Sequence, residues 1–209
     1  MQYRLFLLIF IIPLALSAQR FQGGVMAGMS GAQVDGDTYA GFNHIGLQGG
    51  AFVKTKFSDW VGSQMEIRYI SKGARENKQE PDPLFYKLNL RYVEVPVLLN
   101  IYFNEDIFAE IGLSPALLMS KSKEDENGVL PKDQFDDYKK FDLGGALGFN
   151  YQFTDRFIAN IRYTYSLITI REHITDDNYY YSIMAKILGY DQGDYNNVLT
   201  LGVYYLIGK

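Results

Sequence analysis

Residues 141–153 and 157–167 alternate between apolar residues and polar or small residues, with a repeat of two positions. A period of two places the two kinds of residue on opposite faces of a β-strand. Only Thr154, Asp155 and Arg156 separate the two stretches, so the pair is predicted to form a β-hairpin. Each strand spans roughly ten residues between its aromatic ends, the length of a tilted strand that crosses a lipid bilayer.

The hairpin alone is compatible with two kinds of protein. An apolar outer face edged by aromatic residues, over a polar inner face, is typical of a transmembrane β-barrel. The alternative is a soluble sandwich or a lipocalin-like carrier, in which the apolar face lines the interior. The two differ in whether Leu147 and Phe149 face lipid or an enclosed cavity, and the rest of the chain favours the first.

The same alternation recurs along the chain and predicts eight strands. Long and short connections follow one another in turn, as in outer-membrane barrels, which have short periplasmic turns and longer external loops. We therefore predict an all-β, eight-stranded antiparallel up-and-down transmembrane β-barrel with both chain ends on the periplasmic side. The approximate strand limits are 21–34, 45–57, 60–71, 86–103, 107–119, 141–153, 157–167 and 197–207.

Residues 86–103 fit this pattern only with an interruption. The apolar residues take even positions over 88–92 and odd positions over 95–101. If both sets face lipid, the strand must absorb one extra residue near Val93 and Glu94. The sequence therefore predicts a β-bulge there, beside Pro96, which cannot donate to a strand ladder.

Aromatic residues flank each of the three predicted short turns. Such residues concentrate at membrane–water interfaces, so they are predicted to form a girdle at the periplasmic interface. A soluble lipocalin-like barrel would explain eight strands but not this girdle. The predicted girdle residues are Phe57, Trp60, Phe103, Phe108, Phe153 and Phe157.

The opposite strand faces carry charged residues that would point into the barrel. Eight strands leave an interior just wide enough for side chains, and an isolated buried ion is costly. We predict a polar network that fills the lumen with salt bridges. A gated proton or small-solute path through the same groups is the alternative. The predicted network residues are Glu66, Arg68, Glu94, Glu110, Asp142 and Arg162.

The amino terminus is predicted to be a secretory signal peptide. Arg4 precedes an apolar run over residues 5–16, and the small residues Ser17 and Ala18 follow. Cleavage after Ala18 would leave residues 19–209 as the barrel domain. The chain has 209 residues, a formal charge of -4 and no cysteine. This composition excludes disulfides and thiolate chemistry and argues against a nucleic-acid partner.

Candidate catalytic and metal-binding residues are sparse. His44 and His173 are the two histidines, each beside a predicted external loop. With a nearby serine or aspartate they could serve a lipid hydrolase or acyltransferase, but no serine lies in a nucleophile-elbow setting. The acidic loops lack the spacing of a calcium-binding EF-hand. We expect no catalytic residue, no metal site and no cofactor. The apolar loop over residues 171–196 is predicted to fold over the barrel mouth as a lid, to pack as a short helix or to dock a partner.

Several segments resemble the PorT-like family of small bacterial outer-membrane β-barrels. The most specific is Tyr92-x-Glu94-x-Pro96. The resemblance implies an outer-membrane barrel in contact with lipid, lipopolysaccharide and the outer-membrane assembly machinery. Some family members are associated with type IX secretion, so secretion or envelope proteins are expected partners. The chain departs from many outer-membrane proteins in ending on Lys209 instead of an aromatic residue. The resembling segments are residues 23–28, 33–37, 66–73, 92–100, 109–112, 142–144 and 148–153.

Overall fold

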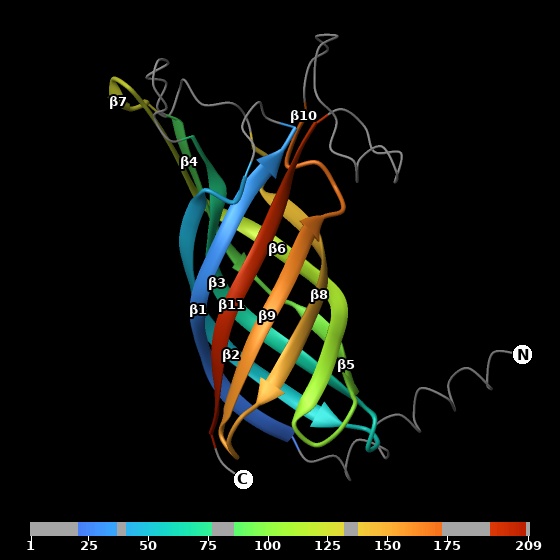
Figure 1. Cartoon of the computed structure of the whole chain (residues 1–209). Helices are drawn as coiled ribbons and strands as arrows, with labels where there is room; N and C mark the ends of the chain where they lie inside the picture. The colour runs from blue at the N-terminus through green and yellow to red at the C-terminus, as the bar shows by residue number, and fades with distance from the viewer. Residues whose placement is uncertain (1–20, 37–40, 77–85, 132–137, 173–192, 208–209) are drawn as a thin grey trace, which may run out of the picture.

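The structure is a computed structural model that describes residues 21–36, 41–76, 86–131, 138–172 and 193–207 (Figure 1). The predicted signal peptide and most of the predicted 171–196 loop, with His173, lie outside the described residues. None of the described segments forms a helix that is long and apolar enough to cross a membrane.

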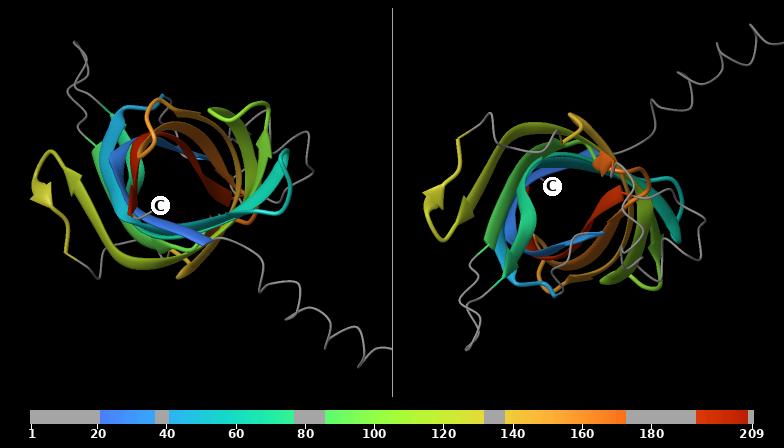
Figure 2. Two further views of the ribbon diagram at one scale, coloured as in Figure 1. Left: turned by 90° about the horizontal axis from the view of Figure 1, so that it is seen from below. Right: turned by 90° about the horizontal axis from the view of Figure 1, so that it is seen from above.

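The described residues form strands joined into one sheet that closes on itself (Figures 1 and 2). Neighbouring strands pair antiparallel in the order β1-β2-β3-β4-β6-β8-β9-β11, and β11 pairs with β1 to complete a ring of eight described strands. β5 continues the line of β4 between β3 and β6, whereas β7 and β10 are short additions to β6 and β11. The predicted eight-stranded antiparallel barrel is therefore confirmed. The strands are β1 (Phe21–Asp35), β2 (His44–Lys56), β3 (Val61–Glu76), β4 (Tyr86–Glu94), β5 (Val97–Tyr102), β6 (Ile107–Asp125), β7 (Gly128–Val129), β8 (Phe141–Gln152), β9 (Phe157–Ser166), β10 (Arg171–Glu172) and β11 (Gly193–Ile207).

Three tight turns lie at one end of the ring, which we call the short-turn end. Polar side chains close all three by accepting backbone hydrogen bonds; in the first turn the Ser58 Oγ atom accepts from the amide of Val61 at 3.2 Å. The Asn104 Oδ1 atom accepts from the amides of Asp106 and Ile107 at 2.9 and 2.8 Å. The Thr154 Oγ1 atom likewise accepts from the amide of Phe157 at 3.0 Å. Such local side-chain bonds favour a turn over continued strand. The opposite end carries the longer connections and is called the long-loop end.

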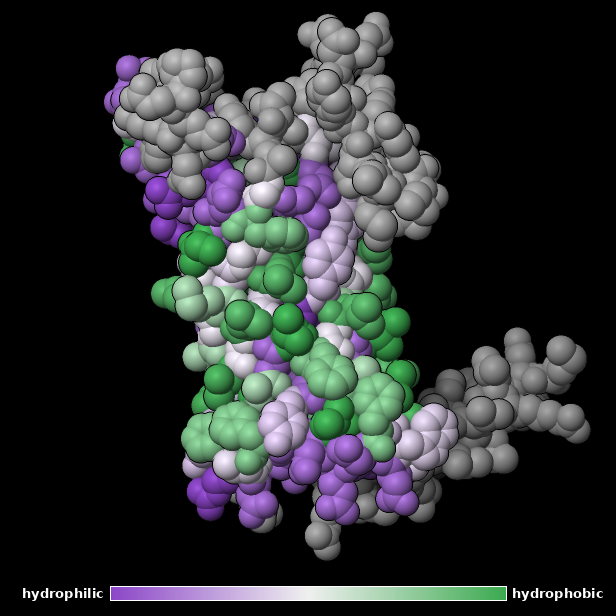
Figure 3. All heavy atoms as spheres, in the orientation of Figure 1, coloured by the Kyte–Doolittle hydropathy of each residue, from purple (hydrophilic) through white to green (hydrophobic). Residues whose placement is uncertain are grey.

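The outer wall of the barrel is apolar over a broad belt (Figure 3). Leu47, Leu147 and Leu201 are exposed to 66%, 59% and 59%, whereas Glu66 and Arg162 are exposed to 2% and 0%. Apolar side chains thus face outward and charged ones inward, the reverse of a soluble carrier. The interpretation of the chain as a lipocalin-like carrier is therefore excluded.

One predicted girdle residue is placed differently by the structure. Phe108 is only 1% exposed and lies inside the barrel, with its ring centroid 4.9 Å from that of Tyr102. Ile107 begins β6 pointing outward, so the strict alternation of the strand turns Phe108 inward. The prediction for Phe108 was wrong because proximity to a turn does not decide which face a residue occupies. The other five predicted girdle residues are exposed on the outer wall: Phe57, Trp60, Phe103, Phe153 and Phe157.

The predicted bulge in the strand over residues 86–103 was also wrong. Leu88, Leu90 and Tyr92 are fully buried, in the same phase as the inward-facing residues of β5, so β4 does not change face. The irregularity lies instead in the pairing of β4 with β6, where the register shifts between Arg91 and Tyr92 and leaves Met119 as the extra residue on β6. The prediction failed because it assumed that every apolar residue faces lipid.

Candidate functional site

The inward-facing side chains fill the lumen in three layers. A buried apolar cluster at the short-turn end, the short-turn layer, consists of Met26, Phe52, Tyr102, Phe108, Ile158, Tyr204 and Leu206. A second cluster, the long-loop layer, consists of Ala32, Val34, Ile70, Ala74, Leu88, Leu90, Tyr92, Ala116, Tyr138, Ile170 and Val198. Buried polar residues lie between the two layers, as on β6, where Glu110 and Ser114 separate Phe108 from Ala116.

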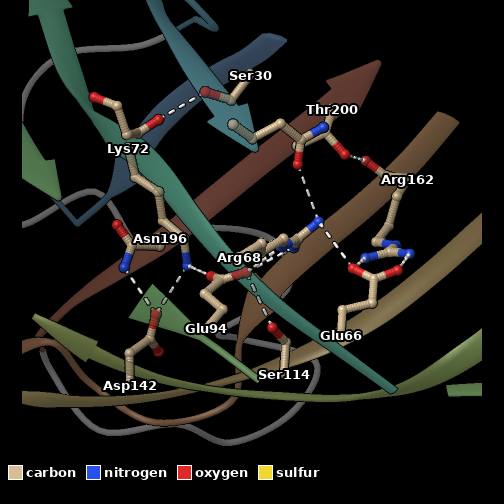
Figure 4. A network of polar contacts seen from close by, with 12 residues as sticks. Ser30, Glu66, Arg68, Lys72, Glu94, Ser114, Asp142, Arg162, Asn196 and Thr200 are labelled. Atoms are coloured by element: carbon tan, nitrogen blue, oxygen red, sulfur yellow. Dashed lines mark hydrogen bonds and ion pairs between the residues drawn. The ribbon is translucent and has the colours of Figure 1, made fainter. Parts of the chain in front are cut away.

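The polar layer contains a chain of charged side chains whose signs alternate, which we call the charge ladder (Figure 4). Its members in order are Glu110, Arg162, Glu66, Arg68, Glu94, Lys72 and Asp142, with successive nitrogen–oxygen distances of 2.5, 2.7, 3.9, 2.6, 2.7 and 3.3 Å. Each of the three cations therefore lies between two carboxylates.

Arg162 of β9 organises the half of the ladder nearer the short-turn end. Its Nη1 and Nη2 atoms donate to the two carboxylate oxygens of Glu66 at 2.9 and 2.7 Å, and its Nε atom donates to Glu110. The hydroxyl of Tyr204 accepts from Arg162 and donates to Glu66 at 3.0 Å. This bidentate guanidinium–carboxylate geometry gives strong, directional pairing.

Arg68 and Lys72 of β3 organise the other half. The Nε atom of Arg68 donates to Glu94 at 2.8 Å, and Lys72 contacts Glu94 and Asp142 at 2.7 and 3.3 Å. Asn196 of β11 donates to the same Asp142 oxygen at 2.9 Å. Within the described ranges, the uncharged side chains that hydrogen-bond to ladder side chains are Gln48, Gln64, Ser114, Asn150, Asn160, Asn196 and Tyr204.

Burial makes this pairing obligatory. Every ladder residue is at most 2% exposed, so each ion has lost most of its hydration. Desolvation of an ion costs several kcal/mol, and only close counter-ions with additional hydrogen bonds offset that cost. The ladder supplies both, with four carboxylates and three cations linked in one network. The ladder links β3, β4, β6, β8 and β9, and apolar layers cover its two ends.

The structure places all six predicted network residues in the ladder and adds Lys72. The predicted strand ended at residue 71 and left Lys72 in the following loop, whereas β3 continues to Glu76. A signal was present, because Lys72 follows Arg68 and Ile70 on the same alternating face. The same alternation turns Asn150 and Asn160 inward, in phase with Asp142 and Arg162, but it does not indicate which charged residue each of them contacts.

His44 lies at the start of β2 and is 2% exposed. Its Nε2 atom is 3.4 Å from the Ser71 hydroxyl. No carboxylate of a described residue hydrogen-bonds to the ring, and the described residues contain no cluster of three or more potential metal ligands from histidine and acidic side chains. Nucleophilic catalysis needs a histidine oriented by a third group beside an accessible hydroxyl. The described part of the chain does not provide that arrangement at His44.

Comparison with known proteins identifies the architecture. Residues 17–172 match the family model described as the outer membrane protein beta-barrel domain. The crystal structure of Neisserial surface protein A is 12% identical, with a TM-score of 0.50, and the match covers 90% of this chain and 98% of that one. The attachment invasion locus protein Ail of Yersinia pestis is 14% identical, with a TM-score of 0.49, over 89% and 98% of the two chains. No curated protein sequence matches the chain.

Proposed function

Because the chain belongs to the outer membrane protein beta-barrel domain family, it works as a barrel in the outer membrane, and we propose that it is a closed, non-enzymatic envelope component. In this proposal the barrel wall and lumen anchor the protein, and the rim at the long-loop end contacts other envelope components. Lipid and lipopolysaccharide surround the apolar belt, and the assembly machinery inserts the barrel after export and removal of residues 1–18.

One observation carries the proposal, namely that side chains occupy the lumen along its length. The charge ladder fills the middle, and the short-turn and long-loop layers cover its two ends. An eight-stranded barrel has room for little more than its own side chains. A conducting path would need water beside the charged groups, but Arg162, Glu94 and Glu110 are each 0% exposed.

Planar-bilayer recording tests the closed lumen. We expect the purified, folded protein to insert without producing stable, ohmic current steps, while an open porin in the same bilayer produces them. Insertion is checked separately by protease protection of the reconstituted protein. Reproducible current steps that scale with voltage would contradict the proposal and support the narrow solute or proton path.

The more specific form of the proposal is a PorT-like link to protein secretion. It is supported by the similarity of residues 92–100 and the other segments to that family. Deletion of the gene is expected to reduce the amount of secreted and surface-attached protein, with lipid A unchanged. Normal secretion with altered lipid A would instead indicate a lipid-modifying enzyme.

A further inference from the structure

The outer wall changes character where β3, β4 and β6 run beyond the apolar belt toward the long-loop end (Figure 1). The registers of these strands place their outward-facing residues in rows that cross all three strands. The last apolar row consists of Tyr69, Val93 and Leu117. Apart from the bulged Met119, no apolar side chain lies in the next three rows, which are Ser71, Arg91 and Ser120, then Gly73, Asn89 and Ser122, and then Arg75, Lys87 and Glu124.

Three cations in these rows, Arg75, Lys87 and Arg91, form what we call the outer cationic patch. Arg75 and Arg91 are exposed, and no carboxylate of a described residue lies within ion-pair distance of either guanidinium group. Glu124 lies 3.9 Å from Lys87, but both side chains are more than a third exposed, so this pair contributes little. Arg75 and Lys87 are directly opposite each other on β3 and β4, where like charges repel. The patch therefore carries excess positive charge on a chain whose formal charge is -4.

Another part of the wall at the long-loop end has a different composition. On β1 the outward positions beyond Met29 carry Gly31, Gln33 and Asp35. Asn197 of the neighbouring strand β11 donates a hydrogen bond from Nδ2 to the Asp35 Oδ2 atom at 3.2 Å. This part of the wall therefore carries an acid and two amides where β3 and β4 carry cations. Solubility alone would favour neither charge, so the difference favours an anionic partner beside β4.

The heights of the cations distinguish between kinds of anionic lipid. The headgroup region of a bilayer is about 5–7 Å thick on each side of the hydrocarbon. Arg91 lies two residues beyond Val93, which is about 7 Å along the strand and about 5 Å in height for a strand tilted by about 40°. Arg75 and Lys87 lie a further four residues along β4, or about 10 Å higher. Arg91 is therefore at the depth of lipid phosphates, whereas the other two cations lie beyond the headgroup of an ordinary phospholipid.

We propose that the outer cationic patch binds the phosphorylated headgroup of lipopolysaccharide, a glycolipid that carries anionic groups at more than one height. Arg91 binds a phosphate next to the acyl chains, because a guanidinium group can donate to two phosphate oxygens at once. Arg75 and Lys87 together bind an anionic group farther from the bilayer, which relieves their mutual repulsion. The inference rests on the proposed function, which places the long-loop end at the cell surface. Small polar side chains beside and between the cations supply hydrogen bonds to the sugars, namely Ser71, Asn89, Ser120 and Ser122.

The test uses the complete barrel folded in detergent micelles and native mass spectrometry, which counts bound lipid molecules. Rough-type lipopolysaccharide is titrated in parallel with the same lipopolysaccharide after removal of its phosphates, and with phosphatidylglycerol. We expect one saturable site for lipopolysaccharide and binding that is at least about tenfold weaker without the phosphates, the loss of at least one charge-assisted contact. Phosphatidylglycerol should bind more weakly than lipopolysaccharide, because its single phosphate reaches only the height of Arg91.

Substitutions separate the patch from general attraction to the barrel. Arg75→Gln, Lys87→Gln and Arg91→Gln should each weaken binding of lipopolysaccharide about fivefold, the contribution expected of one cation beside anionic headgroups, and the triple variant about a hundredfold. The matched control Arg156→Gln removes an exposed arginine at the short-turn end and should change affinity less than about twofold. None of these four side chains is buried, so in vesicles without lipopolysaccharide all variants should unfold at the urea concentration that unfolds the native chain.

Three outcomes would overturn the proposal. The first is equal affinity of the native chain and the triple variant, or no saturable binding at all. The second is equal affinity for lipopolysaccharide with and without its phosphates. The third is binding of phosphatidylglycerol as tight as that of lipopolysaccharide, which would assign the patch to ordinary anionic phospholipid.

The orientation of the barrel is tested separately. Asn127→Cys places a single thiol in the exposed turn between β6 and β7, and a membrane-impermeant maleimide should label it on intact cells. Labelling together with failure of the lipid titration would remove only the lipopolysaccharide site and leave the proposed function in place. Labelling of lysed cells alone would contradict the orientation on which both depend.

Discussion

At the scale of single residues, the charged side chains of the lumen are stabilised by counter-ions that they share. Each ladder cation contacts two carboxylates, so removal of one cation takes an ionic partner from two carboxylates at once. Arg162 is the strongest case, because it binds Glu66 through two hydrogen bonds and Glu110 through a third. Breaking a buried ion pair by removing one partner is far more destabilising than the pair itself is stabilising.

We predict that Arg162→Met lowers the free energy of unfolding by about 3–5 kcal/mol, the loss expected when a buried pair is broken. The change is measured by urea titration of the barrel in lipid vesicles. The control Arg91→Met removes an exposed arginine of β4 and should change that free energy by less than about 0.5 kcal/mol. Equal effects of the two substitutions would show that the ladder is not needed for stability.

A second prediction at this scale concerns the stability of a variant at Gly148 of β8. A Cβ atom at Gly148 would lie 2.3 Å from a Glu110 carboxylate oxygen and 2.9 Å from its Cγ atom, so Gly148→Ala must displace Glu110 from Arg162. We expect a destabilisation of about 1–3 kcal/mol by urea titration. The matched control Gly49→Ala meets only a backbone oxygen at 3.5 Å and should be nearly neutral. A neutral Gly148→Ala would mean that Glu110 can move without loss.

At the scale of strands, the alternation of β4 and β5 shows how far sequence patterns reach. The period of two located the strand over residues 86–103 correctly. It does not show whether a given apolar face of that strand packs inside the barrel or contacts lipid. Leu88, Leu90 and Tyr92 join the long-loop layer inside the barrel, so the outward positions beside them carry Asn89 and Arg91. A barrel interior that is polar throughout was the wrong assumption, because the lumen contains apolar layers as well.

A cysteine scan over residues 88–93 tests whether Leu88, Leu90 and Tyr92 face the lumen. The chain has no native cysteine that would interfere. Spin labels at the odd positions should be mobile and accessible to relaxation agents in lipid or water. Labels at the even positions should be immobile and inaccessible, or should prevent folding, because those side chains are buried in the lumen. A change of phase within this segment would restore the bulge predicted near Val93 and Glu94.

At the scale of the whole molecule, the outer surface should match the bilayer in depth. Trp60, the single tryptophan, is 67% exposed at the first tight turn, at the short-turn end of the barrel. We predict that lipids brominated near the headgroup quench its fluorescence more strongly than lipids brominated near the chain ends, because aromatic side chains settle at the interface. The same lipids without bromine are the control. Absence of quenching by either brominated lipid would place the short-turn end in water.

The fold could be predicted from the sequence because alternation and loop length are local properties. The pairing within the ladder could not, because Arg162 and Glu66 are 96 residues apart and meet only when the ring closes. Strand alternation shows that both point inward, but the stagger between strands decides which height each reaches. Six of the seven charged members were therefore predicted, whereas the inclusion of Lys72 and the order of the pairs required the three-dimensional structure.

The order of the ladder has a consequence for how such a barrel can diverge. Glu110 and Asp142 stand at its two termini, so losing either one deprives a single cation of one of two neighbours. Losing an inner member interrupts the chain and takes a partner from two ions at once. Substitutions of ladder residues should therefore be tolerated first at the two ends and last at Arg68. Substitutions of inner members should occur in pairs, in which an acidic residue and the neighbouring basic residue change together.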